Sequence, residues 1–545
     1  MFHAPPAPHA AFPPESVPPA GDRSRVGIAL ALVLGLGALA VVLAGVRSEL
    51  FDLERHTVPK ELVLHATALL CVLLLAPRWR RIELGAVAAA LVAFVGWSAL
   101  SALFATNHWL ALYGFGVSFS GLVIFAAAAR AAREGAGTLV LAGLGCAATV
   151  GAALGAAQAY GMDAAWLADS RPPGATFGNR NFLAHLIAIS TPVLIFLVAR
   201  ARRGIGALPW LLALALAAAV IVLTRSRAAW LALGVALATM TVAVWLRGAT
   251  RSADARPGRL LAALVVAGAA AAAAIALPNE LRWRSDAPYA ETLTRIADFR
   301  EGSGRGRLIQ YRNSLDLVVA DPLLGTGPGN WFVHYPLVTT PGDPSFAGHD
   351  PIPTNPWPSS DWVTTLVERG PIGALLLALA GVAAVLVAVR RLRSDEPGVA
   401  RRAVAALGVL AAAFVAGLFD AVVLLAAPTF FVAAALGALL PPTSPVVSRP
   451  LERRGLRLVR AGTVVLAALV TIVAAGRVAA ILITADDTGR AAIERALRFD
   501  PGSHRLHLQL SRRGGCSVSL PHARAVSRLM PFHDAPRQGL ARCGE

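Results

Sequence analysis

The sequence predicts an all-α protein that crosses a membrane about twelve or thirteen times and carries one large hydrophilic loop. Of its 545 residues, 56% are hydrophobic and only 15% are charged, whereas a soluble protein has about 45–50% apolar and about 25% charged residues. The apolar residues form nearly uncharged blocks of about 20 residues, the length of helix that crosses about 30 Å of hydrocarbon. These observations exclude a soluble enzyme, a disordered chain and a secreted disulfide scaffold.

Each predicted span is an apolar block bounded by polar or turn-forming residues. The 60–76 block contains Glu61 and His65 near its start, and Asp420 alone separates the 402–420 and 422–440 blocks, so these boundaries rest on weaker patterns. The predicted spans are 26–46, 60–76, 83–104, 110–129, 137–159, 182–200, 208–223, 228–246, 260–277, 370–389, 402–420, 422–440 and 461–483.

These spans divide the chain into five regions. Residues 1–25 are rich in Pro and Ala, and we expect them to be disordered and cytoplasmic. The membrane bundle comprises 26–277 and 362–483, and an ordered loop subdomain at 278–361 separates its two parts. Residues 484–545 form a small helical tail.

The distribution of positive charge predicts the orientation of the bundle. The net charge is +18, and Lys60 is the only lysine. The arginines cluster in alternate loops, which the positive-inside rule places in the cytoplasm. An odd number of spans then places the 278–361 loop and the tail outside, in the periplasm of a cell with two membranes. Because no domain presents a basic face, we expect no nucleic-acid partner.

Two arginines lie in the TRSR sequence between two spans, on the side where arginine is disfavoured. One interpretation is that Arg225 and Arg227 extend their long side chains to the lipid headgroups. The other is that their guanidinium groups bind phosphate through paired hydrogen bonds. Arg307 in the large loop offers a second such contact, and two guanidinium groups on one diphosphate would stabilise it as a leaving group without a metal.

Several other polar residues lie at the same membrane boundary. Asn179 and Asn181 precede a span and either cap its helix or contact a sugar or lipid headgroup. Asp361 and Glu368 lie seven residues apart on one helix face, where a carboxylate serves as a general base or interacts with the helix N-terminus.

The large loop contains two histidines and a glycine-rich turn. His334 and His349 are general-base candidates at neutral pH, with an ordinary surface histidine as the alternative for each. The GTGPGN turn at 325–330 lacks the Lys-Ser/Thr ending of a phosphate-binding P-loop. We therefore expect a tight turn whose glycines adopt positive φ.

The cysteines and the tail give weaker signals. Cys516 and Cys543 can pair if the tail is outside the cytoplasm, and no Cys or His spacing predicts a metal site. Residues 490–513 resemble the end of a tetratricopeptide repeat, but the tail is too short for a repeat array. We expect it to help to hold a substrate or to pack on the loop subdomain.

Four segments carry a family resemblance and occur in this order: GNRNFLAHL, TRSRAAWLAL, GRGRLIQYRNSLDLVVADPLLGTGPGNWFVHYP and SDWVTTLVERGPIGALLL. Together they resemble the O-antigen ligase family, which also includes O-antigen polymerases and some oligosaccharide-to-protein transferases. The resemblance covers 175–390 in detail and implies a metal-independent, inverting glycosyltransferase without a cofactor. The implied donor is a glycan on undecaprenyl diphosphate. Arg227 and Arg307 then bind the diphosphate, with Tyr311 in the aromatic position.

The resemblance leaves the acceptor and the general base open. Lipid A-core, a growing glycan and a protein hydroxyl need the same donor chemistry; we favour a ligase acting on lipid A-core, with a polymerase as the alternative. Many family members carry a histidine where this chain has Ser359, so His349, His334, Asp361 or Glu368 is the candidate base. A transporter, a lipid flippase and a structural role are the competing classes. The expected location is the bacterial inner membrane.

Overall fold

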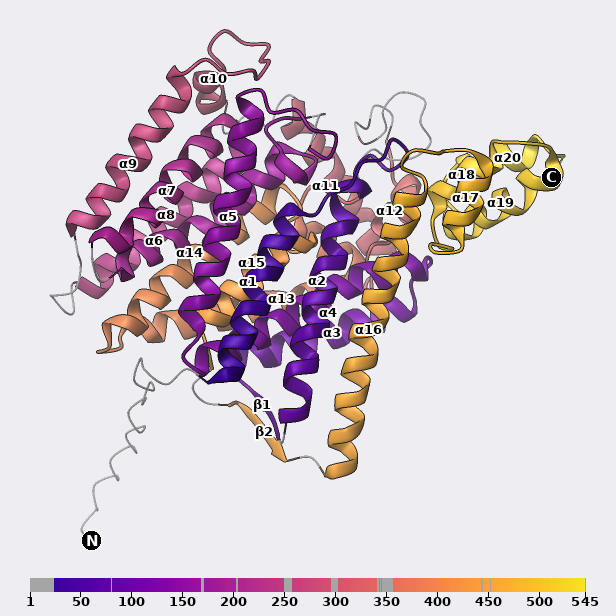
Figure 1. The fold of residues 1–545 in the computed structure, drawn as a ribbon. Helices are drawn as coiled ribbons and strands as arrows, with labels where there is room; N and C mark the ends of the chain where they lie inside the picture. Colours follow the sequence, from indigo (N-terminus) through magenta and orange to yellow (C-terminus); the bar gives the residue numbers. More distant parts are fainter. Residues whose placement is uncertain are drawn as a thin grey trace.

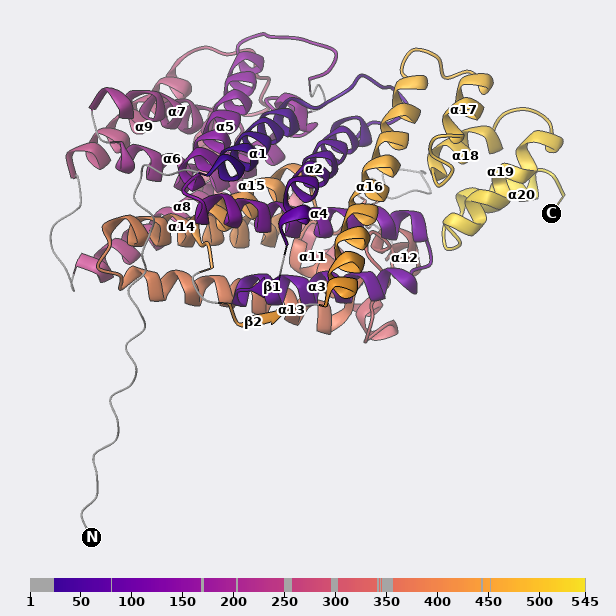
Figure 2. The same ribbon diagram turned by 60° about the horizontal axis from the view of Figure 1, so that its bottom comes forward.

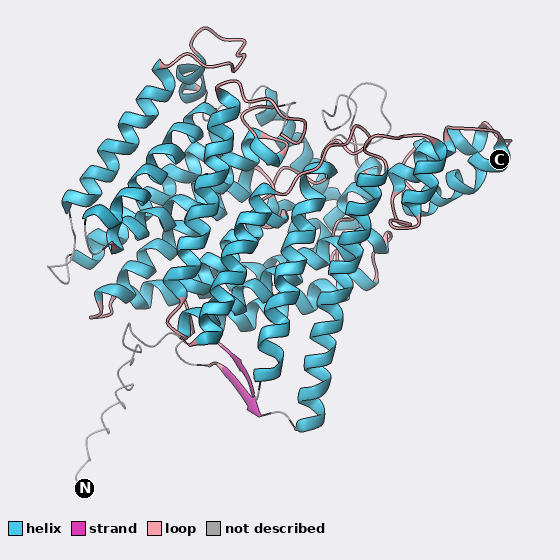
Figure 3. Cartoon of the chain, viewed as in Figure 1, coloured by secondary structure: helices cyan, strands magenta, loops and turns pink. Residues whose placement is uncertain are grey.

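The computed structural model shows a bundle of long helices with a smaller helical tail beside one end (Figure 1). It describes residues 24–79, 81–167, 171–201, 204–248, 257–295, 302–340, 343, 345, 356–442, 445–450 and 452–544. Almost all the regular structure in these ranges is helical (Figure 3), which confirms the predicted fold class. The predicted disordered segment falls almost entirely outside the described residues.

Within the described ranges, twelve helices are long and apolar enough to cross a membrane. They are α1 (Arg25–Leu43), α2 (Glu54–Leu75), α3 (Ala86–Leu103), α4 (His108–Arg133), α5 (Gly137–Ala159), α6 (Arg180–Arg200), α7 (Gly204–Leu223), α8 (Arg227–Gly248), α9 (Pro257–Ala276), α13 (Asp361–Leu392), α14 (Pro397–Phe419) and α16 (Arg453–Ile483). A shorter apolar helix, α15 (Ala426–Leu439), coincides with the remaining predicted span, 422–440.

Helix α6 lies at the centre of the bundle, and 89% of its apolar 18-residue stretch is buried. It packs against α5, α7, α8, α14 and α15. Small residues let other helices approach closely: a Cβ added at Gly143 of α5 would lie 2.7 Å from the Cα of Gly35 of α1. Helices α7 and α9 form one flank of the bundle, and α2 and α16 lie toward the other (Figures 1 and 2).

The chain between α9 and α13 contains the short helices α10 (Pro288–Thr294) and α12 (Trp331–His334), the longer α11 (Gly302–Ala320) and a 3-10 turn, η3 (Tyr335–Leu337). The tail contains α17 (Arg490–Leu497), α18 (His504–Ser511), α19 (Cys516–Leu529) and α20 (Ala535–Ala541). Trp331 and Phe332 share a hydrophobic core with Leu508, Val526 and Met530. The tail therefore packs on the loop, one of the two roles expected for it.

A disulfide joins Cys516 to Cys543 and fixes α19 against the end of the chain.

One feature has no counterpart in the predicted fold. A strand after α2, β1 (Arg81–Leu84), pairs antiparallel with a strand before α16, β2 (Val447–Pro450). The pair lies at the end of the bundle opposite the tail (Figures 1 and 3). It therefore brings two arginine-rich connections to one end, as the charge pattern predicts.

Candidate functional site

The two arginines of the TRSR turn both contact the loop near α10. Arg225 donates from Nε to Thr292 Oγ1 (2.8 Å) and from Nη2 to Glu291 Oε2 (3.3 Å). Arg227 donates from Nη1 to the carbonyl oxygen of Arg295 (2.5 Å). Arg225 adopts a positive φ of 51°, a strained conformation for a residue with a side chain. The turn is therefore held in a specific shape against the loop.

A tryptophan of the loop, Trp283, contacts Arg225 and a second arginine, Arg180. The guanidinium groups of Arg225 and of Arg180 each lie 4.7 Å from the centre of the Trp283 ring, a cation–π arrangement. The backbone N–H of Arg180 donates to the carbonyl oxygen of Arg171 (3.1 Å). Arg171 is exposed. Planar cations in this arrangement are suited to a phosphate-bearing ligand.

The asparagines beside Arg180 have different roles. Asn179 is the N-cap of α6, and its side chain accepts a hydrogen bond from the backbone N–H of Asn181 (3.0 Å). The capping interpretation is thus confirmed for Asn179. Asn181 is half-buried in the first turn of α6, and its contact with a sugar stays a prediction.

Helix α11 brings Arg307 and Tyr311 to the N-terminal end of α6 and the C-terminal end of α14. The half-buried Arg307 guanidinium is within electrostatic range of the His185 imidazole and of the Asp420 carboxylate. The Tyr311 hydroxyl lies 2.6 Å from the carbonyl oxygen of Ser359 and 2.7 Å from that of Leu418. Burial raises the pKa of Tyr311 to about 12, so its phenol stays protonated at neutral pH.

Asp420 is the carboxylate that this arrangement adds to the predicted candidates. It caps the end of α14, and its Oδ1 accepts a hydrogen bond from the backbone N–H of Ala421 (2.9 Å). Burial raises its pKa to about 6, against the opposing effects of Arg307, that N–H group and Arg171. A carboxylate with this pKa titrates near neutral pH, as a general base requires. We define the arginine cluster as Arg171, Arg180, Arg225 and Arg307.

Asp361 and Glu368 are both buried and both bonded within the fold. The Asp361 carboxylate accepts hydrogen bonds from the backbone N–H groups of Val422 and Val423, each 2.9 Å long, and so holds the turn before α15. Glu368 forms an ion pair with Arg369 (3.1 Å), with side-chain exposures of 3% and 1%. Their roles as general bases stay hypotheses that compete with these structural contacts.

The two predicted histidines and Ser359 fall in different places. His334 Nε2 lies 2.9 Å from Thr106 Oγ1, its ring contacts Phe532, and burial lowers its pKa. It thus lies between the loop, the tail and the α3–α4 connection. His349 lies outside the described residues. Ser359, at the position of the family histidine, donates to Gln310 Oε1 (3.1 Å).

The glycine-rich turn is a structural joint, as predicted. Gly325, Gly327 and Gly329 all have positive φ, and the N–H groups of Thr326 and Gly327 donate to carbonyl oxygens of the first turns of α13 (3.0 and 2.9 Å). The helix is kinked there at Gly370, with φ of 66°. The turn therefore docks the loop onto α13.

Four neighbours of the site are not among the residues predicted from the sequence: His185, Asp420, Arg171 and Trp283. His185 was visible within GNRNFLAHL, one and a half turns after Arg180. Asp420 was visible as the one charge between two apolar blocks. A charged residue at such a break is a signal of function in a membrane protein, but the electrostatic interaction of Asp420 with Arg307 depends on how α11 packs.

Comparison with known proteins agrees with the resemblance. The family model described as O-antigen ligase matches residues 212–378. This segment contains the TRSR turn, α8, α9, the described part of the loop and the kink of α13. No curated protein matches the chain. The apolar helices identify the chain as a polytopic membrane protein, and its segment 212–378 is similar to the O-antigen ligase family.

Proposed function

We propose that the protein is a glycosyltransferase of the bacterial cytoplasmic membrane that transfers a glycan from undecaprenyl diphosphate to an acceptor hydroxyl. The observation that carries the proposal is the family match at 212–378, because it covers both the TRSR turn and α11. These two segments supply Arg225, Arg227 and Arg307 at the edge of the bundle. A donor with a polyprenyl chain is soluble only in lipid, which accounts for catalysis at a membrane boundary.

In the proposed reaction, the arginine cluster and Arg227 hold the diphosphate. A guanidinium group binds two phosphate oxygens in a fixed plane and keeps its charge at any physiological pH. The acceptor oxygen forms a bond to the anomeric carbon from the face opposite the diphosphate. The bond from that carbon to the phosphate oxygen breaks, and undecaprenyl diphosphate leaves with the bonding electrons. The guanidinium groups stabilise the negative charge that develops on it.

The proton of the acceptor hydroxyl needs a base, and we assign this role to Asp420. Its pKa of about 6 leaves it mostly deprotonated at neutral pH, and the electrostatic effect of Arg307 on it supports a position near the proposed diphosphate site. Asp361 and Glu368 already use their carboxylates in the fold. His349 is the competing candidate, and its substitution belongs in the same experiment.

The proposal places the loop and the tail in the periplasm. The disulfide between Cys516 and Cys543 supports this side, because disulfides persist in oxidising compartments. The pairing of β1 with β2 supports it as well, because it gathers arginine-rich connections at the opposite end of the bundle.

For the acceptor, we propose lipid A-core, which makes the protein an O-antigen ligase. The alternatives are a growing glycan, which makes it a polymerase, and a protein hydroxyl. A glycan gel of a deletion strain separates them. Free lipid-linked polymer with bare core indicates a ligase, and core with a single repeat unit indicates a polymerase. Loss of glycan from a protein band with unchanged lipopolysaccharide indicates transfer to protein, and unchanged glycan on both lipid and protein contradicts all these transfers.

Complementation of that strain tests the diphosphate site. Arg307→Ala should lower transfer about 10²–10³-fold, the loss expected for one charge-stabilising donor. Arg227→Lys should also fail, because lysine lacks the planar fork. The matched control is Arg390→Ala, which removes an exposed arginine of α13. Normal surface glycan with both Arg307→Ala and Arg227→Lys, at equal membrane levels, would reject the assignment.

A further inference from the structure

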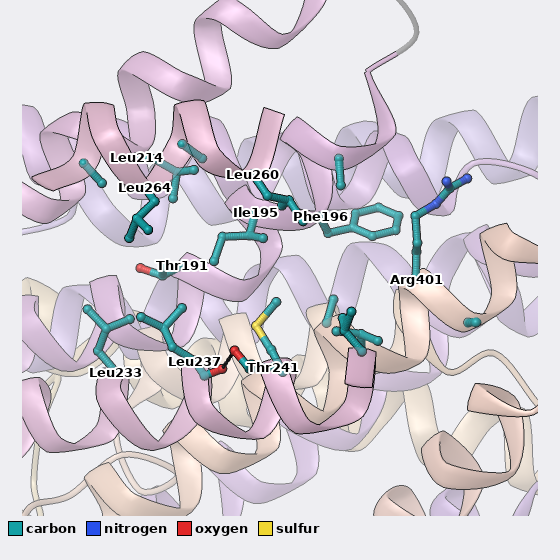
Figure 4. Close-up of a pocket in the computed structure, with 18 of the residues that line it drawn as sticks. Thr191, Ile195, Phe196, Leu214, Leu233, Leu237, Thr241, Leu260, Leu264 and Arg401 are labelled. Carbon is teal, nitrogen blue, oxygen red and sulfur yellow. Dashed lines mark hydrogen bonds between the residues drawn. The ribbon is translucent and has the colours of Figure 1, made fainter. Parts of the chain in front are cut away.

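A second site lies in the membrane part, away from the arginine cluster. A cavity of about 780 Å³ is lined by residues of α6, α7, α8, α9 and α14. Its walls are mainly aliphatic, with Leu233 and Leu237 on α8 and Phe196 on α6 (Figure 4). Its size is in the range of small-molecule and lipid sites.

The cavity follows the half of the bundle that ends at the arginine-rich connections. Leu233 and Arg247 both line it and are 14 residues apart on α8, which corresponds to about 21 Å along the helix axis. One leaflet of the hydrocarbon core is about 15 Å thick, half of the ~30 Å total. The cavity is therefore long enough for an acyl chain of a single leaflet.

The polar end of the cavity carries positive charge. Arg247 and Arg401 line it, and Arg401 extends from α14 beside the ring of Phe196, at the opposite end from Leu233 (Figure 4). Among the described residues that line the cavity are these two arginines and no acidic residue. Leu264 lines the cavity and is 70% exposed, so the cavity is not sealed from the surroundings of the bundle.

We propose that this cavity binds an anionic phospholipid of the leaflet at the arginine-rich end. Its acyl chain lies among the leucines, and its phosphate group is paired with Arg247 and Arg401. Basic pockets between membrane helices on the cytoplasmic side are suited to such headgroups. The charge favours a phospholipid over the polyprenyl chain of the donor, because that chain has no charged group at its far end. The site is independent of glycan transfer.

Native mass spectrometry of the purified full-length protein in detergent tests the proposal, with dioleoyl phosphatidylglycerol as the probe. Replacing both arginines, Arg247→Gln with Arg401→Gln, should weaken binding about tenfold or more. Arg390→Gln, which changes an exposed arginine that does not line the cavity, should leave binding unchanged.

A second pair of variants tests the apolar part of the cavity. Ala267 of α9 lines it, whereas Ala272 of the same helix is exposed and does not. Ala267→Trp should reduce phosphatidylglycerol binding, and Ala272→Trp should not. Unchanged binding in both the double arginine variant and Ala267→Trp would overturn the proposal. A second result would also overturn the proposal: Ala267→Trp loses binding of polyprenyl phosphate but still binds phosphatidylglycerol. The occupant of the cavity would then be the donor chain.

Discussion

Burial and opposite charge together determine the chemistry of Asp420. It lies between α14 and α15. It interacts electrostatically with four neighbouring side chains, those of Arg307, Arg171, Tyr311 and Asp361. Burial favours the neutral acid, and the two arginines favour the carboxylate. The outcome is a pKa of about 6. The group thus contributes most to stability below the ordinary pKa of an aspartate, and that contribution is lost as the pH rises through about 6.

If Asp420 is the general base, transfer activity should rise with pH around 6, because only the carboxylate accepts a proton. Asp420→Asn should lose about 10²–10⁴-fold in rate, the usual contribution of a general base, and should no longer show this rise. Transfer from a lipid-linked donor in detergent, measured between pH 5 and 8, checks it. An unchanged pH profile in Asp420→Asn, with loss of activity in His349→Ala, would assign the base to His349 instead.

The sequence pattern predicted where helices begin better than it predicted the partners of the polar side chains. The spacing of Asp361 and Glu368 correctly indicated a helix start at the boundary, since α13 begins at Asp361. The carboxylate of Asp361 nevertheless binds N–H groups at Val422 and Val423, about 60 residues further along the chain. No local pattern encodes such a contact, because it depends on how α13 packs beside the turn before α15.

At the level of elements, the kink of α13 determines how the loop meets the bundle. Gly370 has a positive φ, and a Cβ added there would lie 2.1 Å from the carbonyl oxygen of Leu323. A Cβ at Gly325 would lie 2.3 Å from the carbonyl oxygen of Val367. The two backbones are in direct contact, and only glycine fits at either position.

Gly370→Ala should therefore destabilise the protein by about 1–3 kcal/mol or more, the cost of a strained backbone position. Gly381→Ala on the same helix, where an added Cβ meets nothing within 4 Å, should be neutral or slightly stabilising. Thermal unfolding in detergent measures both. Equal melting temperatures for the two variants would contradict the close backbone contact between the glycine-rich turn and α13.

The helices were largely predictable and the small sheet was not. Runs of about 20 apolar residues predict a span regardless of context, and each of the predicted spans contains a helix. The strands of β1 and β2 are four residues each and arise from segments more than 350 residues apart. Such short strands pair because the bundle brings their ends together, and this information is absent from either segment.

Across the whole molecule, the tail is joined to the bundle by both polar and apolar contacts. The Tyr113 hydroxyl donates to Asp500 Oδ1 (3.0 Å), and Arg505 pairs with Glu54 (2.6 Å). The tail also packs on Trp331 and Phe332 of the loop. The orientation of the loop above the bundle therefore depends partly on where the tail is docked.

Gly502 is the closest point of this docking, because a Cβ added there would lie 2.2 Å from Cγ of Trp109. An indole ring packed against the tail cannot move away without opening the interface, so Gly502→Ala should loosen the tail from α4. Limited proteolysis of the purified protein should then cleave the chain after α16 faster, while the bundle stays intact. Gly515→Ala, where an added Cβ has open space, should keep the wild-type cleavage rate. If the Gly502→Ala tail is as protected as the control, the apolar contacts with the loop must hold the tail without the Trp109 contact.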